Sequence, residues 1–123
     1  KRLNMLLAVL EKRAGFALGS KDVFINITGG ISIEDPALDP AIIAAILSSY
    51  HDSPISQKIC FAAEIGLSGE IRPISKIDQR IQEAEKLGFE SIVISKYSKL
   101  SIDKKFIGVD KLSKVESLVN FLF

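Results

Sequence analysis

The sequence predicts one domain of the α/β class, in which helices pack on a sheet. Its 123 residues are enough for a single compact domain. Hydrophobic residues make up 47% of the chain and charged residues 25%, a balance typical of folded proteins rather than disordered ones. Helical and extended patterns alternate in the second half, which favours a right-handed crossover there.

The first segment has the periodicity of an amphipathic helix. Four leucines recur at intervals of three or four residues: Leu3, Leu6, Leu7 and Leu10. Gly15 follows the last turn and predicts the end of this helix. Residues 21–28 then alternate between apolar and polar side chains, which predicts a strand that ends at Gly29-Gly30.

A second helix is predicted over residues 41–50. Asp39 and Asp35 each precede a proline, so either one can be its N-cap. We expect both aspartates to act as caps rather than as metal ligands or acid–base groups. Because the helix is rich in Ala and Ile on most sides, we expect it to be buried.

The middle of the chain predicts a strand, a hairpin and a third helix. Residues 58–65 are apolar and suit an interior strand, and the glycines that follow favour a hairpin around 68–71. Ser75 and Asp78 have the spacing of a capping box, and Gly88 is the expected stop of the helix. One face of this helix carries its apolar residues, Ile77, Ile81, Ala84 and Leu87.

The last part of the chain predicts two short strands and a helix. The strands are expected at 91–95 and 106–109, and Asp110 is the expected N-cap of the final helix. The apolar face of that helix comprises Leu112, Val115, Leu118, Val119 and Leu122.

Net charge and rare residues limit the possible functions. Sixteen basic and fifteen acidic side chains nearly cancel, so net charge does not identify a nucleic-acid partner, although it allows a local basic patch. Cys60 is the single cysteine and His51 the single histidine of the sequence, and these two residues cannot form a zinc site by themselves. A lone cysteine is typical of a reducing compartment. His51 and the nearby Ser48 are typical of the polar end of a helix. No apolar run reaches the roughly 18 residues that cross a bilayer, so we expect no membrane partner. Because the chain begins at Lys1, we expect it to be a piece of a longer protein.

Basic residues are the main candidates for an interaction surface. Seven of them are candidates for contact with DNA or with a neighbouring subunit: Arg2, Lys12, Arg13, Lys21, Arg72, Lys76 and Arg80. Lys76 and Arg80 lie four residues apart on one face of a helix. Phosphate binding and an ordinary solvated surface are both open for these residues. The few aromatic residues follow the apolar pattern, so no platform for stacking bases is evident.

Several segments together resemble the C-terminal domain of the RadA (Sms) family of bacterial DNA repair proteins. The resemblance begins in residues 2–3, 6–15, 22–24, 26 and 29–30 and continues in 64–67 and 69–73. It extends over nearly the whole chain. That domain is similar to the proteolytic domain of Lon proteases. The resemblance therefore implies a ribosomal protein S5 domain 2-like fold, with a mixed sheet and packed helices.

The resemblance also indicates where a catalytic Ser–Lys dyad of Lon proteases would lie. The G-P-S-A-G motif corresponds to residues 35–39, which place Ala37 at the nucleophile's position. The G-G-x-K motif corresponds to residues 75–78, which place Asp78 at the lysine's position. A methyl group cannot attack a carbonyl, and a carboxylate cannot replace the neutral amine. We therefore expect no catalytic activity in this domain.

The function implied by the resemblance is that of a non-proteolytic scaffold in a RecA-like ATPase that migrates DNA branches during recombinational repair. Such a parent protein is expected in the cytoplasm as a hexameric ring acting on single-stranded or branched DNA. ATP, Mg and Zn are expected in the rest of the parent chain, and no cofactor or metal within these residues. Two alternatives stay open: a purely structural ring-closing domain without DNA contact, and a peptidase with a nucleophile relocated to Ser32, Ser68 or Ser75.

Overall fold

A computed structural model describes residues 2–16, 35–101 and 106–123 of the chain. The strand predicted at 21–28, its end at Gly29-Gly30, and the candidates Lys21 and Ser32 lie outside the described residues. The main described sheet has the strand order β1 (Ile59–Ala62), β4 (Ser91–Ser95) and β5 (Gly108–Leu112). Both strand pairs are parallel, and helix α3 (Ile77–Lys86) lies in the connection between β1 and β4.

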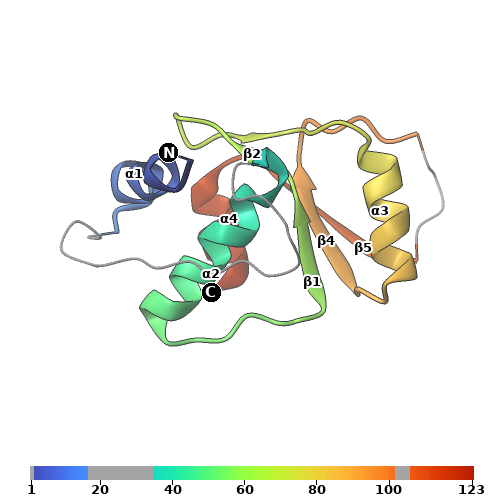
Figure 1. Ribbon diagram of the computed structural model, residues 1–123, viewed down its shortest axis with the longest axis horizontal. Coiled ribbons are helices and arrows are strands. Elements are labelled where there is room, and N and C mark those ends of the chain that lie inside the picture. The colour runs from blue at the N-terminus through green and yellow to red at the C-terminus, as the bar shows by residue number, and fades with distance from the viewer. Residues whose placement is uncertain (1, 17–34, 102–105) are drawn as a thin grey trace.

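Helices lie on both sides of this sheet. Figure 1 shows α3 on one side and α2 (Asp39–His51) and α4 (Val115–Leu122) on the other, with α1 (Arg2–Ala14) beyond them. A parallel sheet between helices is the architecture of an α/β domain, so this part of the expectation is confirmed. Within the described ranges, no helix is both long enough and apolar enough to cross a membrane.

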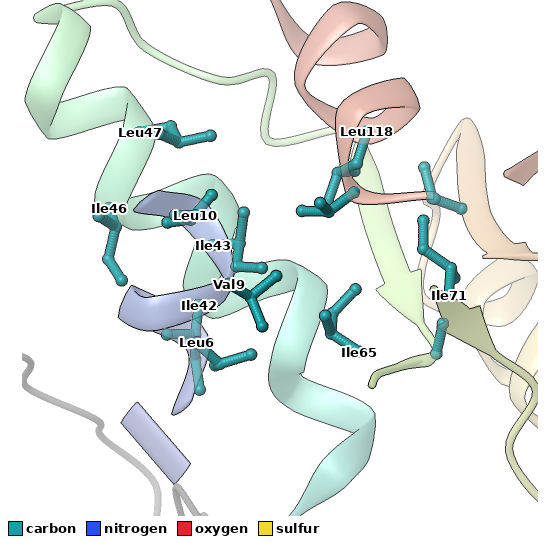
Figure 2. Packing of buried hydrophobic residues seen from close by; sticks show 13 residues of the cluster. Leu6, Val9, Leu10, Ile42, Ile43, Ile46, Leu47, Ile65, Ile71 and Leu118 are labelled. Atoms are coloured by element: carbon teal, nitrogen blue, oxygen red, sulfur yellow. The ribbon is translucent and has the colours of Figure 1, made fainter. Parts of the chain in front are cut away.

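The central strand β4 separates two hydrophobic cores, because successive side chains of a strand point to opposite faces. Val93 belongs to the larger core, which α1, α2 and α4 share with Ile65 and Ile71 (Figure 2). Ile92 and Ile94 face the smaller core beneath α3. Each fully buried side chain of this size contributes roughly 1.5–3 kcal/mol relative to an exposed one. The predicted strand 91–95 and the burial of the second helix are thus confirmed.

The apolar segment 58–65 forms two strands rather than one. It breaks at the fully buried Ala63, and β2 (Glu64–Ile65) pairs with β3 (Ile71–Arg72) in a separate antiparallel sheet. The predicted hairpin is therefore confirmed, whereas the single continuous strand is wrong. The physical reason is a partner outside the segment. The N–H of Ile65 donates to the carboxylate of Asp39 at 2.9 Å, and this hydrogen bond holds the end of the segment away from β4.

The predicted N-cap of α2 is half right. The Asp35 carboxylate accepts from the N–H of Ala37 at 3.0 Å and caps a short 3₁₀ helix, η1 (Pro36–Leu38). Asp39 begins α2 but is not its cap; its side chain is fully buried and accepts other hydrogen bonds.

The predicted capping box of α3 is wrong. Lys76 precedes α3 in the left-handed conformation (φ 58°, ψ 38°) and makes no side-chain cap. The carboxylate of Asp78 instead accepts hydrogen bonds from Ser101, which is distant in sequence. The predicted stop at Gly88 is confirmed, with φ +90°. Because the helix already ends at Lys86, Leu87 is 67% exposed and does not join the predicted apolar face.

The last strand is displaced from its predicted position. It runs through Gly108–Leu112, and Asp110 pairs with Val93 in the sheet instead of capping a helix. Leu112 likewise lies in the strand, and α4 begins only at Val115. Pairing with β4 over five consecutive residues stabilises the strand more than one side-chain cap would stabilise a helix here, because a cap contributes only about 1 kcal/mol to stability.

Candidate nucleic-acid interface

Arg2 is held inside the fold. Its Nε and Nη2 lie 2.7 Å and 2.5 Å from the two carboxylate oxygens of Asp39, and Nη2 also lies 3.0 Å from Glu64 Oε2. The hydrogen bonds to Asp39 raise the pKa of Arg2, although partial burial opposes this shift. A guanidinium engaged with two carboxylates has a structural role and is not a free cation at the surface.

The other two candidates of α1 lie in its last turn. Lys12 and Arg13 are exposed, at the end of the helix where its macrodipole favours positive charge. The aliphatic part of the Arg13 side chain lies against the hairpin turn at Gly69. A methyl group added at Gly69 would lie only 3.1 Å from Arg13 Cγ. This helix end is therefore packed on the turn between β2 and β3.

Arg72 and Arg80 have internal partners. The Nε and Nη2 of Arg72 donate to Glu70 Oε2 at 3.0 Å and 2.6 Å. The pKa of Glu70 is lowered by its own backbone N–H and then by Arg72. Arg80 Nε donates to the carbonyl of Ser75 at 3.3 Å. By contrast, Lys76 makes no side-chain hydrogen bond or ion pair with any described residue.

An open groove of about 600 Å³ lies beside Lys76. It is lined by residues 73–74, by Lys76 and the first turn of α3, and by residues 97–99. Tyr97 and Lys99 are exposed where they line the groove, and Tyr97 lies outside both cores, with 62% of the residue's surface accessible. Tyr97 thus departs from the apolar pattern that the sequence suggested for the aromatic residues.

Positive charge is concentrated around this groove. Segments 71–80 and 95–101 carry five cationic side chains and one carboxylate, although the whole chain has a net charge of only +1. Lys96, Tyr97 and Lys99 are not among the candidates that the sequence pattern identified. The signal that identifies them is an aromatic residue between two lysines directly after a strand, and only the fold brings it next to Lys76.

The two positions that the resemblance assigned to a Lon-type dyad carry other side chains. Ala37 is buried in η1, and Asp78 in the first turn of α3 accepts from the hydroxyl of Ser101 at 2.5 Å. Within the described ranges, no hydrogen bond joins these two residues. Ser68 and Ser75, the described sites proposed for a relocated nucleophile, are exposed, and neither donates its hydroxyl to a described base.

The remaining reactive groups of the sequence have structural surroundings. The hydroxyl of Ser48 donates to the carbonyl of Ser53 at 2.6 Å, while the His51 ring packs near Phe16 and Phe123. Burial raises the pKa of the half-buried Cys60 thiol, which favours its neutral, unreactive form. In the three described ranges, no group of three His, Cys, Asp or Glu side chains could hold a metal ion.

The chain is similar to known proteins over most of its length. A family model described as "Subunit ChlI of Mg-chelatase" matches residues 4–98. The chain is 43% identical over 118 residues to the DNA repair protein RadA of Streptococcus pneumoniae, which covers 93% of this chain and 28% of the relative. It is 45% identical over 93 residues to RadA of Bacillus subtilis, which covers 76% of this chain and 20% of the relative.

A third RadA, from Streptococcus pyogenes serotype M1, is 41% identical over 123 residues, with 99% of this chain and 27% of the relative covered. The chain thus spans between 20% and 28% of the length of these curated relatives. From its match to the family model, the chain belongs to the ChlI family, and its relatives at about 40–45% identity are named DNA repair protein RadA.

Proposed function

We propose that this chain is a non-proteolytic scaffold domain of a RadA-type DNA repair ATPase, which supports assembly of a hexameric ring and binding of DNA in recombinational repair. The observation that carries the proposal is the identity of 41–45% to proteins named DNA repair protein RadA. The description of the ChlI family names a chelatase subunit, whereas the relatives, at 41–45% identity over most of the chain, are named DNA repair protein RadA.

The parent protein, on this proposal, is a cytoplasmic, ATP-dependent branch-migration helicase. It acts on single-stranded or branched DNA and holds ATP, Mg and Zn outside this chain. The parallel strands β1 and β4, with helices on both sides, are compatible with the S5 domain 2-like, Lon-like fold that the resemblance implies.

The chemistry at two positions supports the proposed absence of proteolysis. A Ser–Lys mechanism needs a hydroxyl and a neutral amine within hydrogen-bond reach of each other. Ala37 offers a buried methyl group, and the Asp78 carboxylate is engaged by Ser101. A serine-reactive phosphonate probe tests this point, since labelling of Ser32, Ser68 or Ser75 would support a relocated nucleophile instead.

Charge reversal tests the proposed role in DNA binding and assembly. The variant of the full-length protein carries Arg72→Glu, Lys76→Glu and Arg80→Glu, and its DNA affinity is measured by fluorescence anisotropy at several salt concentrations. We expect weaker binding with a shallower salt dependence, because fewer phosphates are neutralised. Mass photometry of the same variant measures ring assembly.

A matched control has the same change of charge at exposed lysines elsewhere in the fold. These are Lys58, Lys86 and Lys111. We expect the control variant to bind DNA like the wild type. If the variant with Arg72→Glu, Lys76→Glu and Arg80→Glu also retains full DNA binding and ring assembly, the proposed role of these three residues is wrong.

The second candidate function is a ring-closing domain that never contacts DNA. Two observations favour it: the candidate cations Arg2 and Arg72 are both engaged by carboxylates of the chain itself. This candidate would be supported if the charge-reversal variant at Arg72, Lys76 and Arg80 forms rings and binds DNA as well as the wild type does.

A further inference from the structure

We propose that the groove between residues 73–79 and 97–99 binds a single strand of DNA, with a base stacked on Tyr97 and phosphates contacted by Lys76 and Lys99. This inference rests on the proposed function and names the part of the domain that would carry its DNA contact. It replaces the arginines that the sequence favoured, because Arg72 and Arg80 already have partners within the fold.

The groove has the electrostatics of a phosphate site. Two lysines from separate segments of the chain, Lys76 and Lys99, line the groove. The first turn of α3, directly after Lys76, also lines the groove, and the N–H groups of a first turn have no acceptor within their own helix. These N–H groups and the positive end of the helix dipole favour an anion at this position.

One acidic side chain also lines the groove. The carboxylate of Asp78 accepts from both the N–H and the hydroxyl of Ser101, so its hydrogen-bonding capacity is partly used inside the fold. Lys96 and Arg80 add positive charge in the adjoining segments. The balance of charge around the groove therefore stays positive and is complementary to a nucleic-acid backbone.

Tyr97 gives the reason for choosing a single strand over a duplex. Tyr97 is 62% exposed, while its backbone is fixed, because its N–H donates to the buried hydroxyl of Ser95 at 3.1 Å. The flanking N–H groups of Lys96 and Ser98 donate to Leu112 and Ser95 carbonyls at 2.8 Å and 3.1 Å. An exposed ring on a fixed backbone can stack on a base, and only an unpaired base presents its face.

The test measures binding of fluorescently labelled oligothymidylate by the full-length protein, in parallel with an abasic oligonucleotide of equal length. The variants are Lys76→Ala with Lys99→Ala, Tyr97→Ala and Tyr97→Phe. The control is Lys58→Ala with Lys86→Ala, which removes two exposed lysines away from the groove. Circular dichroism melting of each variant verifies that it is folded.

Each variant has a distinct expected result. The plot of log affinity against log salt has a negative slope. In the variant with Lys76→Ala and Lys99→Ala this slope becomes shallower by about 1.4, the value for two phosphate contacts of a single strand. Tyr97→Ala weakens binding of oligothymidylate about tenfold and leaves binding of the abasic strand unchanged, whereas Tyr97→Phe restores the affinity. The lysine control binds both strands like the wild type.

Other results overturn the inference in separable ways. If wild type binds DNA and the groove variants bind equally well, the groove is wrong while the proposed function stands. If only the lysine variant loses affinity, the groove contacts phosphates without stacking, and the single-strand assignment is wrong. If the wild type binds neither oligonucleotide at low salt, the DNA-binding part of the proposed function fails together with the inference.

Discussion

Arg2 and Asp39 are 37 residues apart in sequence and form an ion pair through two nitrogen–oxygen contacts, of 2.7 Å and 2.5 Å. The Asp39 side chain is fully buried and also accepts the N–H of Ile65 at 2.9 Å. Since Glu64 shares the same guanidinium, the beginnings of α1 and α2 meet β2 at this point. One buried carboxylate thereby connects three segments of the fold.

Arg2→Ala is expected to lower the free energy of unfolding by about 3 kcal/mol, because it leaves the buried charge of Asp39 without its counter-ion. Arg2→Lys is expected to recover only part of this loss, since an ammonium cannot make the two parallel contacts. Urea unfolding followed by circular dichroism measures both changes. Lys12→Ala, on the exposed side of the same helix, is the control, and a loss for Arg2→Ala no larger than for this control would contradict the structural role.

Ser95 and Ser98 offer a matched pair of hydroxyl deletions. Ser95 is fully buried, and its Oγ donates to the Ile71 carbonyl at 2.8 Å and accepts from the N–H of Tyr97. Ser95→Ala is expected to cost about 2 kcal/mol, because both partners lose a hydrogen bond. The buried Oγ of Ser98 has no partner among the described residues, so Ser98→Ala is expected to leave stability unchanged or higher. Equal losses for the two variants, measured by thermal or urea unfolding, would contradict these hydrogen-bond assignments.

Gly69→Ala is expected to destabilise the fold more than Gly88→Ala. Both glycines have positive φ, +82° and +90°, so an alanine at either position costs about 1–2 kcal/mol of backbone strain. At Gly69 the added methyl would also lie 3.1 Å from Arg13 and 3.2 Å from Val115, whereas at Gly88 it would meet nothing within 4 Å. We expect a total of about 2–3 kcal/mol at Gly69. A smaller loss at Gly69 than at Gly88 would show that α1 does not pack on this turn.

The Glu70 carboxylate is expected to titrate below the usual pKa of a glutamate, because its own backbone N–H and then Arg72 stabilise the charged form. A lowered pKa in the folded state means that the contribution to stability is fully present above about pH 4.3, the unfolded value, and is lost as the pH falls through the folded value. NMR titration of the side-chain carboxyl carbon measures the midpoint. Arg72→Ala should move that midpoint upward, and an unchanged midpoint would show that the ion pair does not form in solution.

Local patterns of the sequence determined the elements that depend on near neighbours. The leucine spacing of residues 3–10 and the apolar run at 91–95 correctly predicted α1 and β4. The stops at Gly15 and Gly88 were equally local, because each needs only a positive φ after a last helical turn. The α/β class followed from the same alternation of periodicities.

The errors arose where a distant partner outweighed a local signal. Asp39, Asp78 and Asp110 each had the local pattern of a helix cap. In the fold, Asp39 binds Arg2, Asp78 binds Ser101 and Asp110 pairs within the sheet. A capping hydrogen bond contributes about 1 kcal/mol, so an ion pair or a strand pairing readily displaces it.

The candidate groove shows the same division between sequence and tertiary structure. The sequence by itself determined that cations are abundant near residues 72–80. The resemblance to Lon proteases also predicts Ala37 and Asp78 at the positions of a nucleophile and its base, where neither side chain has the required chemistry. Only the tertiary structure decided which cations are free, because it placed carboxylates against Arg2 and Arg72. The tertiary structure also brought Tyr97 and Lys99 beside Lys76. These two residues follow the end of β4 and are about twenty positions from Lys76, so no local pattern of the sequence relates them to it.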